Sequence, residues 1–307
     1  MISLSDLRKG VAHLPKFISE YGPIAGPRRL VGLGHWRTMH QVEGQSIFNE
    51  DWDVCITLDA CRADELERKQ GHYEWLNEIG RYLSVGSCTW QWLSRTFDEN
   101  ENNHLDNTVY VSANPFTETF CDPDDFHTLD EVYNYAWDEE IGTVRPRPVT
   151  DRAIHHGRTK QFDRIIIHYL QPHVPFLVDQ SVPLRREEFR EGARGHDDDW
   201  DLVAKGELER ETAIKWYRET LFKVLEDVDI LLSNIDAEDV VITADHGEAF
   251  GEWGLYGHPG GVALPCLIEV PWLETTATDE ETHEPADYDT EGHRPNRDEQ
   301  LKALGYK

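Results

Sequence analysis

The sequence predicts an α/β fold, a three-layer α/β/α sandwich built around a largely parallel central sheet. Two observations lead to this prediction. Apolar, β-branched segments recur along the chain, and stretches with a helical spacing of apolar residues lie between them. Nearly continuous apolar runs are typical of strands that are covered on both faces, and strands that alternate with helices form parallel sheets. The length of 307 residues and a hydrophobic share of 39% allow one large domain with a sizeable core.

Five apolar segments are expected to form strands, and the longest amphipathic segment is expected to form a helix. The expected strands, in chain order, are 53–60 (DVCITLDA), 108–114 (TVYVSAN), 164–171 (RIIIHYLQ), 240–245 (VVITAD) and 266–272 (CLIEVPW). Between the third and the fourth strand, apolar residues step by three and four positions, which predicts a helix over 208–234. The charged and glycine-containing stretch 185–206 is expected to be a surface loop.

Charge and polarity divide the chain into three parts. Residues 1–45 form a basic lead-in, residues 46–273 form the α/β domain, and residues 274–307 form a polar, acidic tail with a short terminal helix. Most of the tail is almost free of aliphatic residues, so we expect a loose segment whose histidines, His283 and His293, are not ligands. The last ten residues regain a helical pattern and are expected to dock on the domain.

The chain is strongly acidic, with 59 Asp and Glu against 30 Lys and Arg and a formal net charge of −29. Such a surface repels itself unless salt screens it, and it argues against nucleic acid as a partner. The acid-rich, lysine-poor composition is similar to that of proteins from salt-loving archaea, with an ordinary acidic mesophilic protein as the alternative. The lead-in is the exception, because it is rich in bases: Arg8, Lys9, Lys16, Arg28, Arg29 and Arg37. It predicts either a peripheral contact with an anionic membrane surface or packing on its own acidic domain.

The cysteines indicate a reducing compartment. Cys55, Cys61, Cys88, Cys121 and Cys266 are scattered, and no C-x-x-C pair occurs among them. This pattern suggests neither a disulfide framework nor a zinc knuckle. No apolar run approaches the roughly 20 residues of a membrane span, and the first residues lack the apolar core of a signal peptide. We therefore expect a cytoplasmic protein.

Polar residues that can bind metal follow three of the expected strands. Asp59 ends the first of these segments, His173 follows the second, and Asp245 and His246 end the third. In an open α/β sheet, ligands gather beyond the carboxyl ends of the strands, so these side chains are expected to meet. Carboxylates together with imidazole suit a divalent ion such as zinc or manganese. For Asp59 alone, a helix cap is an equally good interpretation.

Four segments resemble the sulfatase-like branch of the alkaline phosphatase superfamily. They are ITLDACRAD (56–64), HYLQPHVPF (168–176), TADHGEAFGEWGLYGH (243–258) and QLKALGY (300–306). They occur in the family order, and the resemblance spans roughly residues 50 to 272 together with the last turn. It implies the α/β fold already predicted, a catalytic domain over 46–273, and one or two divalent ions at the carboxyl edge of the sheet.

The resemblance also implies roles for individual residues. Asp59, Thr89, Asp245 and His246 match metal ligands, for zinc or manganese first and for calcium or magnesium as alternatives. His173 and His258 match histidines that contact the substrate, protonate the leaving oxygen or hold a second ion. Arg62 and Asp64 match positions that support the first loop. Arg62 is thus a candidate for substrate binding, with a purely structural Arg62–Asp64 ion pair as the alternative.

The nucleophile is expected in the stretch SVGSCTWQWLSRTF (84–97). The family places a nucleophile some tens of residues after the first motif, at the start of a helix, where free N–H groups favour a phosphoryl oxygen. Thr89 is our choice among Ser87, Cys88 and Thr89, and a simple helix cap is the alternative. Cys88 lacks the proline and arginine of the C-x-P-x-R pattern, so formylglycine is not expected. Asp59-Ala60 stands where calcium-binding sulfatases carry two adjacent acids.

These observations predict an ester-cleaving or ester-transferring enzyme. The first hypothesis is a metal-dependent hydrolase or transferase of the EC 3.1 type that acts on small-molecule or glycan-linked phosphate esters through Thr89. The alternatives are a sulfuric ester hydrolase and a catalytically inactive binding protein in surface-glycan metabolism. Tryptophans near the motifs, Trp90, Trp92 and Trp253, could stack on a sugar or fill the core.

Overall fold

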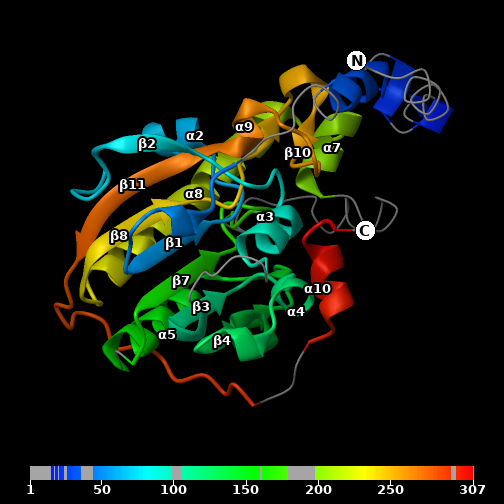
Figure 1. The fold of residues 1–307 in the computed structure, drawn as a ribbon. Coiled ribbons are helices and arrows are strands. Elements are labelled where there is room, and N and C mark those ends of the chain that lie inside the picture. The colour runs from blue at the N-terminus through cyan, green and yellow to red at the C-terminus, as the bar shows by residue number, and fades with distance from the viewer. Residues whose placement is uncertain are drawn as a thin grey trace.

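The computed structural model describes residues 15–16, 18–19, 21–23, 26–35, 44–98, 105–159, 161–178, 198–291 and 295–306. A seven-stranded sheet in the order β2-β11-β8-β1-β7-β3-β4 crosses the molecule (Figure 1). Its strands are β1 (Val54–Leu58), β2 (Ile79–Leu83), β3 (Thr108–Ser112), β4 (Thr128–Glu131), β7 (Arg164–Tyr169), β8 (Ala237–Thr243) and β11 (Glu269–Ala277). The strands from β8 to β4 pair in parallel, so the predicted α/β fold with a largely parallel sheet is confirmed.

Helices cover both faces of this sheet. They are α2 (Ala63–Glu67), α3 (Thr89–Thr96), α4 (Thr117–Phe120), α5 (Pro146–Thr159), α7 (Asp199–Lys205), α8 (Arg210–Leu232), α9 (Pro265–Ile268) and α10 (Arg297–Ala303). Two small ribbons, β5 (Trp137–Asp138) with β6 (Thr143–Val144) and β9 (Ala249–Phe250) with β10 (Tyr256–Gly257), lie outside the main sheet. No helix in the described ranges is long and apolar enough to span a bilayer.

Side-chain alternation assigns the residues of each strand to one of two cores. On β1, Val54, Ile56 and Leu58 pack into the larger core, which includes the buried face of α8. Cys55 points the other way, into a core that contains Trp92 of α3. Because successive side chains of a strand alternate, Asp59 continues the side that faces α3. Both faces of the sheet thus carry a hydrophobic core, and Asp59 lies on the α3 face, beyond the smaller of the two.

One expected strand differs from the observed one. Residues 266–272 were expected to be a strand, but Pro265–Ile268 form a turn of helix and β11 then runs from Glu269 to Ala277. Proline is well tolerated in the first turn of a helix, which explains why the helical turn begins there. β11 pairs antiparallel with β8 because the chain re-enters the sheet at the edge where β8 ends.

The long helix and the last helix lie where the sequence predicts them. α8 occupies Arg210–Leu232 within the predicted 208–234, and α10 docks with Leu304 only 1% exposed. The prediction of a surface loop over 185–206 is wrong for the last part of that range, since Asp199–Lys205 form α7. Asp198 caps this helix, and Trp200 is buried. Residues 179–197 lie outside the described part of the chain.

The segment expected to be a loose tail is held to the domain. β11 runs past residue 273 to Ala277, and the irregular stretch that follows makes polar contacts with the buried Asp151. The His283 Nε2 atom lies 2.6 Å from Asp151 Oδ1, and the Tyr288 hydroxyl donates to Asp151 Oδ2 over 2.8 Å. Charged and aromatic side chains therefore fix a stretch that lacks aliphatic residues, which the apolar pattern could not reveal. His293 lies outside the described residues.

Most of the basic lead-in also lies outside the described residues. Residues 26–35 are helical and contact the loop between β9 and β10. A Cβ atom on Gly32 would lie 2.8 Å from the Trp253 carbonyl oxygen, and His35 stacks on the Trp253 ring at 5.3 Å. The described part of the lead-in thus packs on the domain that it precedes.

Candidate active site

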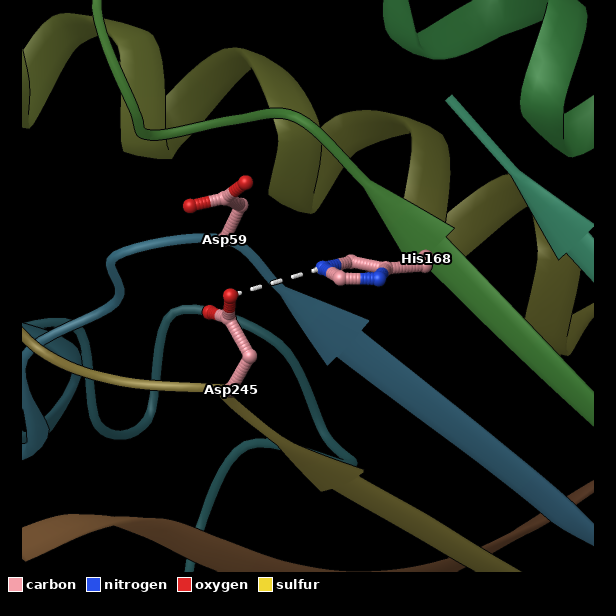
Figure 2. A group of neighbouring side chains, drawn as sticks. All are labelled: Asp59, His168 and Asp245. Carbon is pink, nitrogen blue, oxygen red and sulfur yellow. Dashed lines mark ion pairs between the residues drawn. The ribbon is translucent and has the colours of Figure 1, made fainter. Parts of the chain in front are cut away.

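Three strands bring Asp59, His168 and Asp245 together at the carboxyl edge of the sheet (Figure 2). Thr57 of β1 pairs in register with His168 of β7 and with Thr243 of β8. Asp59 and Asp245 each lie two residues beyond this level, so their side chains point to the same face as His168. Ligand atoms of Asp59, His168 and Asp245 lie within 4.8 Å of one another, and all three residues are 0% exposed.

His246 completes this group of side chains, which we call the strand-end cluster: Asp59, His168, Asp245 and His246. His246 Nε2 lies 3.5 Å from Asp59 Oδ1 and 3.4 Å from Asp245 Oδ2. Its Nδ1 atom faces the Gly247 carbonyl oxygen over 2.8 Å. Since a carbonyl only accepts, Nδ1 carries the proton and Nε2 presents a lone pair to the carboxylates.

The spacing of the cluster suits a small divalent cation. Two ligands that are each about 2.0–2.1 Å from a tetrahedral ion lie about 3.3 Å apart, close to the separations of His246 Nε2 from both carboxylates. Asp59 Oδ1, His168 Nε2 and Asp245 Oδ2 are buried and have no hydrogen-bond partner. Unpartnered buried polar atoms are costly, and a cation would satisfy them. The residues present therefore fit a metal ion.

Electrostatics point to the same conclusion. Burial raises the pKa of Asp59 well above its usual range, and the negative charge of Asp245 adds to this effect. Burial likewise raises the pKa of Glu248 to about 8. Within the described residues, neither Asp59 nor Asp245 forms an ion pair with Arg or Lys. Buried acids that repel each other without a cationic partner favour a bound positive ion.

Thr89 lies at the first position of α3 and points into the cluster. Its Oγ1 atom is 3.2 Å from His246 Nε2 and 3.4 Å from Asp59 Oδ2. Ser87 and Cys88 are engaged elsewhere. The Ser87 hydroxyl bonds Gln91 and Pro259, and burial raises the pKa of the Cys88 thiol to about 12. Of the three candidates for the nucleophile, the structure brings only Thr89 into contact with the strand-end cluster.

His173 and His258 form a pair beside this cluster. Their Nε2 atoms lie 3.3 Å apart, and the rings of His246 and His258 have centroids 4.6 Å apart. His173 Nδ1 faces the Val174 carbonyl oxygen, so His173 Nε2 carries no proton. Burial lowers the pKa of His258 to about 4, and its side chain is 10% exposed. Solvent therefore reaches the site from the side of His258.

Arg62 lies behind the first loop. Its guanidinium donates to both carboxylate oxygens of Asp64, to the Glu252 carboxylate and to the Glu248 carbonyl oxygen. It also lies over the Phe250 ring, 4.2 Å from the centroid. These contacts use most of its N–H groups, and Arg62 is only 8% exposed. The structure thus shows the Arg62–Asp64 ion pair that the sequence left open, while substrate binding by Arg62 stays a prediction.

Three residues of the site escaped the sequence analysis. Asn114, which follows β3, donates to Asp59 Oδ2 over 2.8 Å, and Glu248 Oε1 lies 3.1 Å from His258 Nδ1. His168 stands inside an apolar strand, and its Nδ1 atom is 2.8 Å from the Tyr110 hydroxyl. Glu248 and His168 both belong to the segments that carry the family resemblance. Their place inside those segments is the signal that could have revealed them.

A glycine makes the cluster sterically feasible. The turn after His246 passes so close to α9 that a Cβ atom on Gly247 would lie 2.1 Å from the Cys266 carbonyl oxygen. The Gly247 N–H donates to the Leu267 carbonyl oxygen over 2.8 Å. Only glycine fits this approach, which fixes the backbone that carries Asp245 and His246.

No protein-family model and no curated protein matches the chain. Its fold is similar to that of two solved structures. One is the integral membrane protein lipooligosaccharide phosphoethanolamine transferase A (EptA) from Neisseria meningitidis, at 15% identity and a TM-score of 0.51, with 87% of this chain and 53% of that chain covered. The other is the soluble domain of lipooligosaccharide phosphoethanolamine transferase A from Neisseria meningitidis, at 15% identity and a TM-score of 0.50, with 85% of this chain and 90% of that one covered.

These likenesses concern the fold. The chain spans about half the length of the integral membrane protein. The shared architecture is the alkaline phosphatase/sulfatase-like one that the sequence predicts. The salt-loving archaeal origin stays a prediction.

Proposed function

We propose that this protein is a metal-dependent enzyme that cleaves or transfers phosphate esters, with Thr89 as the nucleophile. One observation carries the proposal. A hydroxyl at the N-terminus of a helix lies 3.2 Å and 3.4 Å from two members of a buried carboxylate–imidazole cluster. The histidine pair His173 and His258 lies beside it. The fold shared with the phosphoethanolamine transferases supports the same class of reaction.

Asp59, Asp245 and His246 would hold the ion, together with the Thr89 oxygen, and His168 is within reach of the same group. Bound there, a divalent ion would lower the pKa of the Thr89 hydroxyl and offset the charge of the phosphoryl group. Zinc and manganese suit this mixture of carboxylate and imidazole best. The Asn114 side-chain amide donates to the Oδ2 atom of Asp59, and this hydrogen bond orients the Oδ1 atom of Asp59 toward His246.

The chain's own groups then divide the reaction into two steps. In the first, the deprotonated Thr89 oxygen forms a bond to phosphorus, and the bond from phosphorus to the leaving oxygen breaks. The leaving group departs as an alkoxide or phenolate and takes up a proton from water. The positive end of the α3 dipole lies where negative charge develops. In the second, water or an acceptor hydroxyl forms a bond to the phosphorus of phospho-Thr89 and gives its proton to His173, whose Nε2 atom presents a lone pair. The bond between phosphorus and the Thr89 oxygen breaks, which restores the free Thr89 oxygen. Water leads to hydrolysis, and an alcohol leads to transfer.

The proposal is tested on purified protein in molar potassium chloride, which screens the acidic surface. We expect about one zinc or manganese ion per chain by elemental analysis, and turnover of a nitrophenyl phosphodiester that a chelator abolishes and the metal restores. Turnover of only the sulfate analogue would instead support the sulfuric ester hydrolase. A metal-free protein without turnover of either ester would support an inactive binding protein.

The substrate class is part of the proposal. The solved structures with this fold are named for phosphoethanolamine transfer to a lipooligosaccharide, which favours a glycan- or lipid-linked phosphate ester here too. Adding an acceptor alcohol to the assay distinguishes the two outcomes of the second step. A transferase would release nitrophenol in excess over the free phosphate product. A cytoplasmic location remains our expectation, and all five cysteines are free thiols.

We also propose that the lead-in contacts an anionic membrane surface. Val31 is 66% exposed and Trp253 51% exposed, and with Pro27 and Arg28 they line one surface hollow. Large exposed apolar side chains beside a cation suit a lipid headgroup layer. Salt screens the attraction between charges but not the burial of apolar side chains. We therefore expect the Trp253→Ser protein to bind anionic vesicles roughly tenfold more weakly than the unaltered protein in a sedimentation assay. Lys302→Ala is the control, and equal binding by all three proteins would contradict the proposal.

A further inference from the structure

The residues after α10 form a wall of the candidate active site. Gln300 of α10 is 2% exposed and donates to the Tyr133 carbonyl oxygen over 2.8 Å, and Leu304 is 1% exposed. Gly305 then turns the chain with φ of +87°, so close to α7 that a Cβ atom there would lie 2.8 Å from Asp198 Oδ2. These buried anchors before the turn, together with the hydrogen bond from the Tyr306 N–H to the Leu301 carbonyl oxygen over 2.9 Å, fix the position of Tyr306.

Tyr306 lies directly on the histidine pair. Its hydroxyl oxygen is 3.3 Å from His173 Nε2 and 3.3 Å from His258 Nε2. Its ring stacks on His173, with centroids 5.7 Å apart and an interplanar angle of 17°, and meets the edge of Phe116 at 4.6 Å. The aromatic contacts orient the ring, and the hydroxyl is thereby aimed at the two nitrogens.

The Tyr306 hydroxyl is a hydrogen-bond donor in this position. His173 Nε2 carries no proton, so the hydroxyl donates to it. A phenol has a pKa of about 10 and so keeps its proton at neutral pH. The Tyr306 hydroxyl lies within hydrogen-bond distance of both members of the histidine pair.

We propose that Tyr306 is a substrate-contacting residue that donates a hydrogen bond to an oxygen of the phosphoryl group. The inference rests on the proposed function, because it assumes that a phosphoryl group reacts with Thr89. A group that is bonded to the Thr89 oxygen and that faces the histidine pair must contact the Tyr306 hydroxyl. His173, whose Nε2 atom carries no proton, cannot donate to such an anion, whereas the phenol can, and it is already oriented. Donors that are fixed before the reaction stabilise the charge of the transition state most effectively.

Tyr306→Phe tests the inference, because phenylalanine keeps the stacking on His173 and removes only the hydroxyl. We expect kcat for a nitrophenyl phosphodiester to fall about 100-fold, as for the loss of one preorganised donor. Inorganic phosphate, measured by calorimetry with the metal-loaded protein, should bind about tenfold more weakly. The melting temperature and the metal content should stay unchanged. Lys302→Ala, an exposed change on the same helix, should match the unaltered protein in every measurement.

The outcomes separate this inference from the proposed function. If Tyr306→Phe turns over ester and binds phosphate like the unaltered protein, Tyr306 is not a substrate contact. A faster Tyr306→Phe protein would also overturn the inference, since the tyrosine would then obstruct the site. If the unaltered protein cleaves no ester but binds phosphate, the proposed function fails, while the phosphate affinity still tests Tyr306. If it binds no phosphate at all, both fail.

Discussion

Thr89→Ala is expected to reduce turnover of a nitrophenyl phosphodiester by about 10³-fold or more, because it removes the only candidate nucleophile that contacts the strand-end cluster. Thr89→Ser should keep turnover within about tenfold, since it retains the hydroxyl at the start of α3. Both variants should stay folded, because neither change opens more than a small cavity. Steady-state rates, melting temperatures and metal content of the three proteins check the prediction.

Matched variants at the neighbouring positions make this experiment specific. Cys88→Ser and Ser87→Ala change residues that the structure ties to Gln91 rather than to the cluster. We expect their rates to stay within about tenfold of the unaltered protein, and Ser87→Ala to lose some stability because Ser87 also bonds the Val262 N–H. Trapped phosphoprotein, mapped by mass spectrometry to Thr89, would add direct support. A fully active Thr89→Ala protein would show that the nucleophile is another group.

The parts of the site that the sequence predicts are those that follow strand ends or begin a helix. Asp59, Asp245 and His246 stop apolar runs abruptly, and Thr89 follows small residues and precedes an amphipathic stretch. In a parallel sheet, strand ends meet at one edge, so their convergence follows from topology alone. The structure brings all four together as that argument requires.

Other parts depend on tertiary contacts that no local pattern encodes. His168 stands inside a strand whose other residues are apolar, and only its register with Thr57 places it beside the carboxylates. Tyr306 reaches the histidine pair because a distant helix docks on the sheet edge. The edge strands β2 and β4 lack continuous apolar runs, since one side of each has no neighbouring strand and several of their residues stay partly exposed. The direction of β11 follows from where the chain re-enters the sheet.

Asp245→Asn should remove the metal and yet stabilise the metal-free protein. Asp245 Oδ1 accepts from the N–H groups of Ala60 and His246 over 3.2 Å and 2.8 Å, and an asparagine oxygen can keep both bonds. The amide nitrogen would replace Oδ2, which lies 3.4 Å from His246 Nε2, and it would donate to that lone pair. The substitution thus ends the repulsion between two buried carboxylates, because Asp245 is one cause of the raised pKa of Asp59.

We therefore expect the metal content of Asp245→Asn to fall below about a tenth of the unaltered protein's, and turnover to fall about 10³-fold, because a ligand is lost and His246 Nε2 is occupied. With both proteins stripped by chelator, the variant should be more stable by roughly 1–2 kcal/mol, as is common when a destabilised active site is neutralised. Elemental analysis and chemical denaturation measure the two effects. Asp51→Asn, at a fully exposed aspartate, is the matched control and should change neither.

A metal-loaded variant, or a stripped variant less stable than the stripped parent, would mean that the carboxylates do not converge to hold a cation. A merely structural strand-end aspartate would give the second of these results, because its replacement would only remove interactions that stabilise the fold.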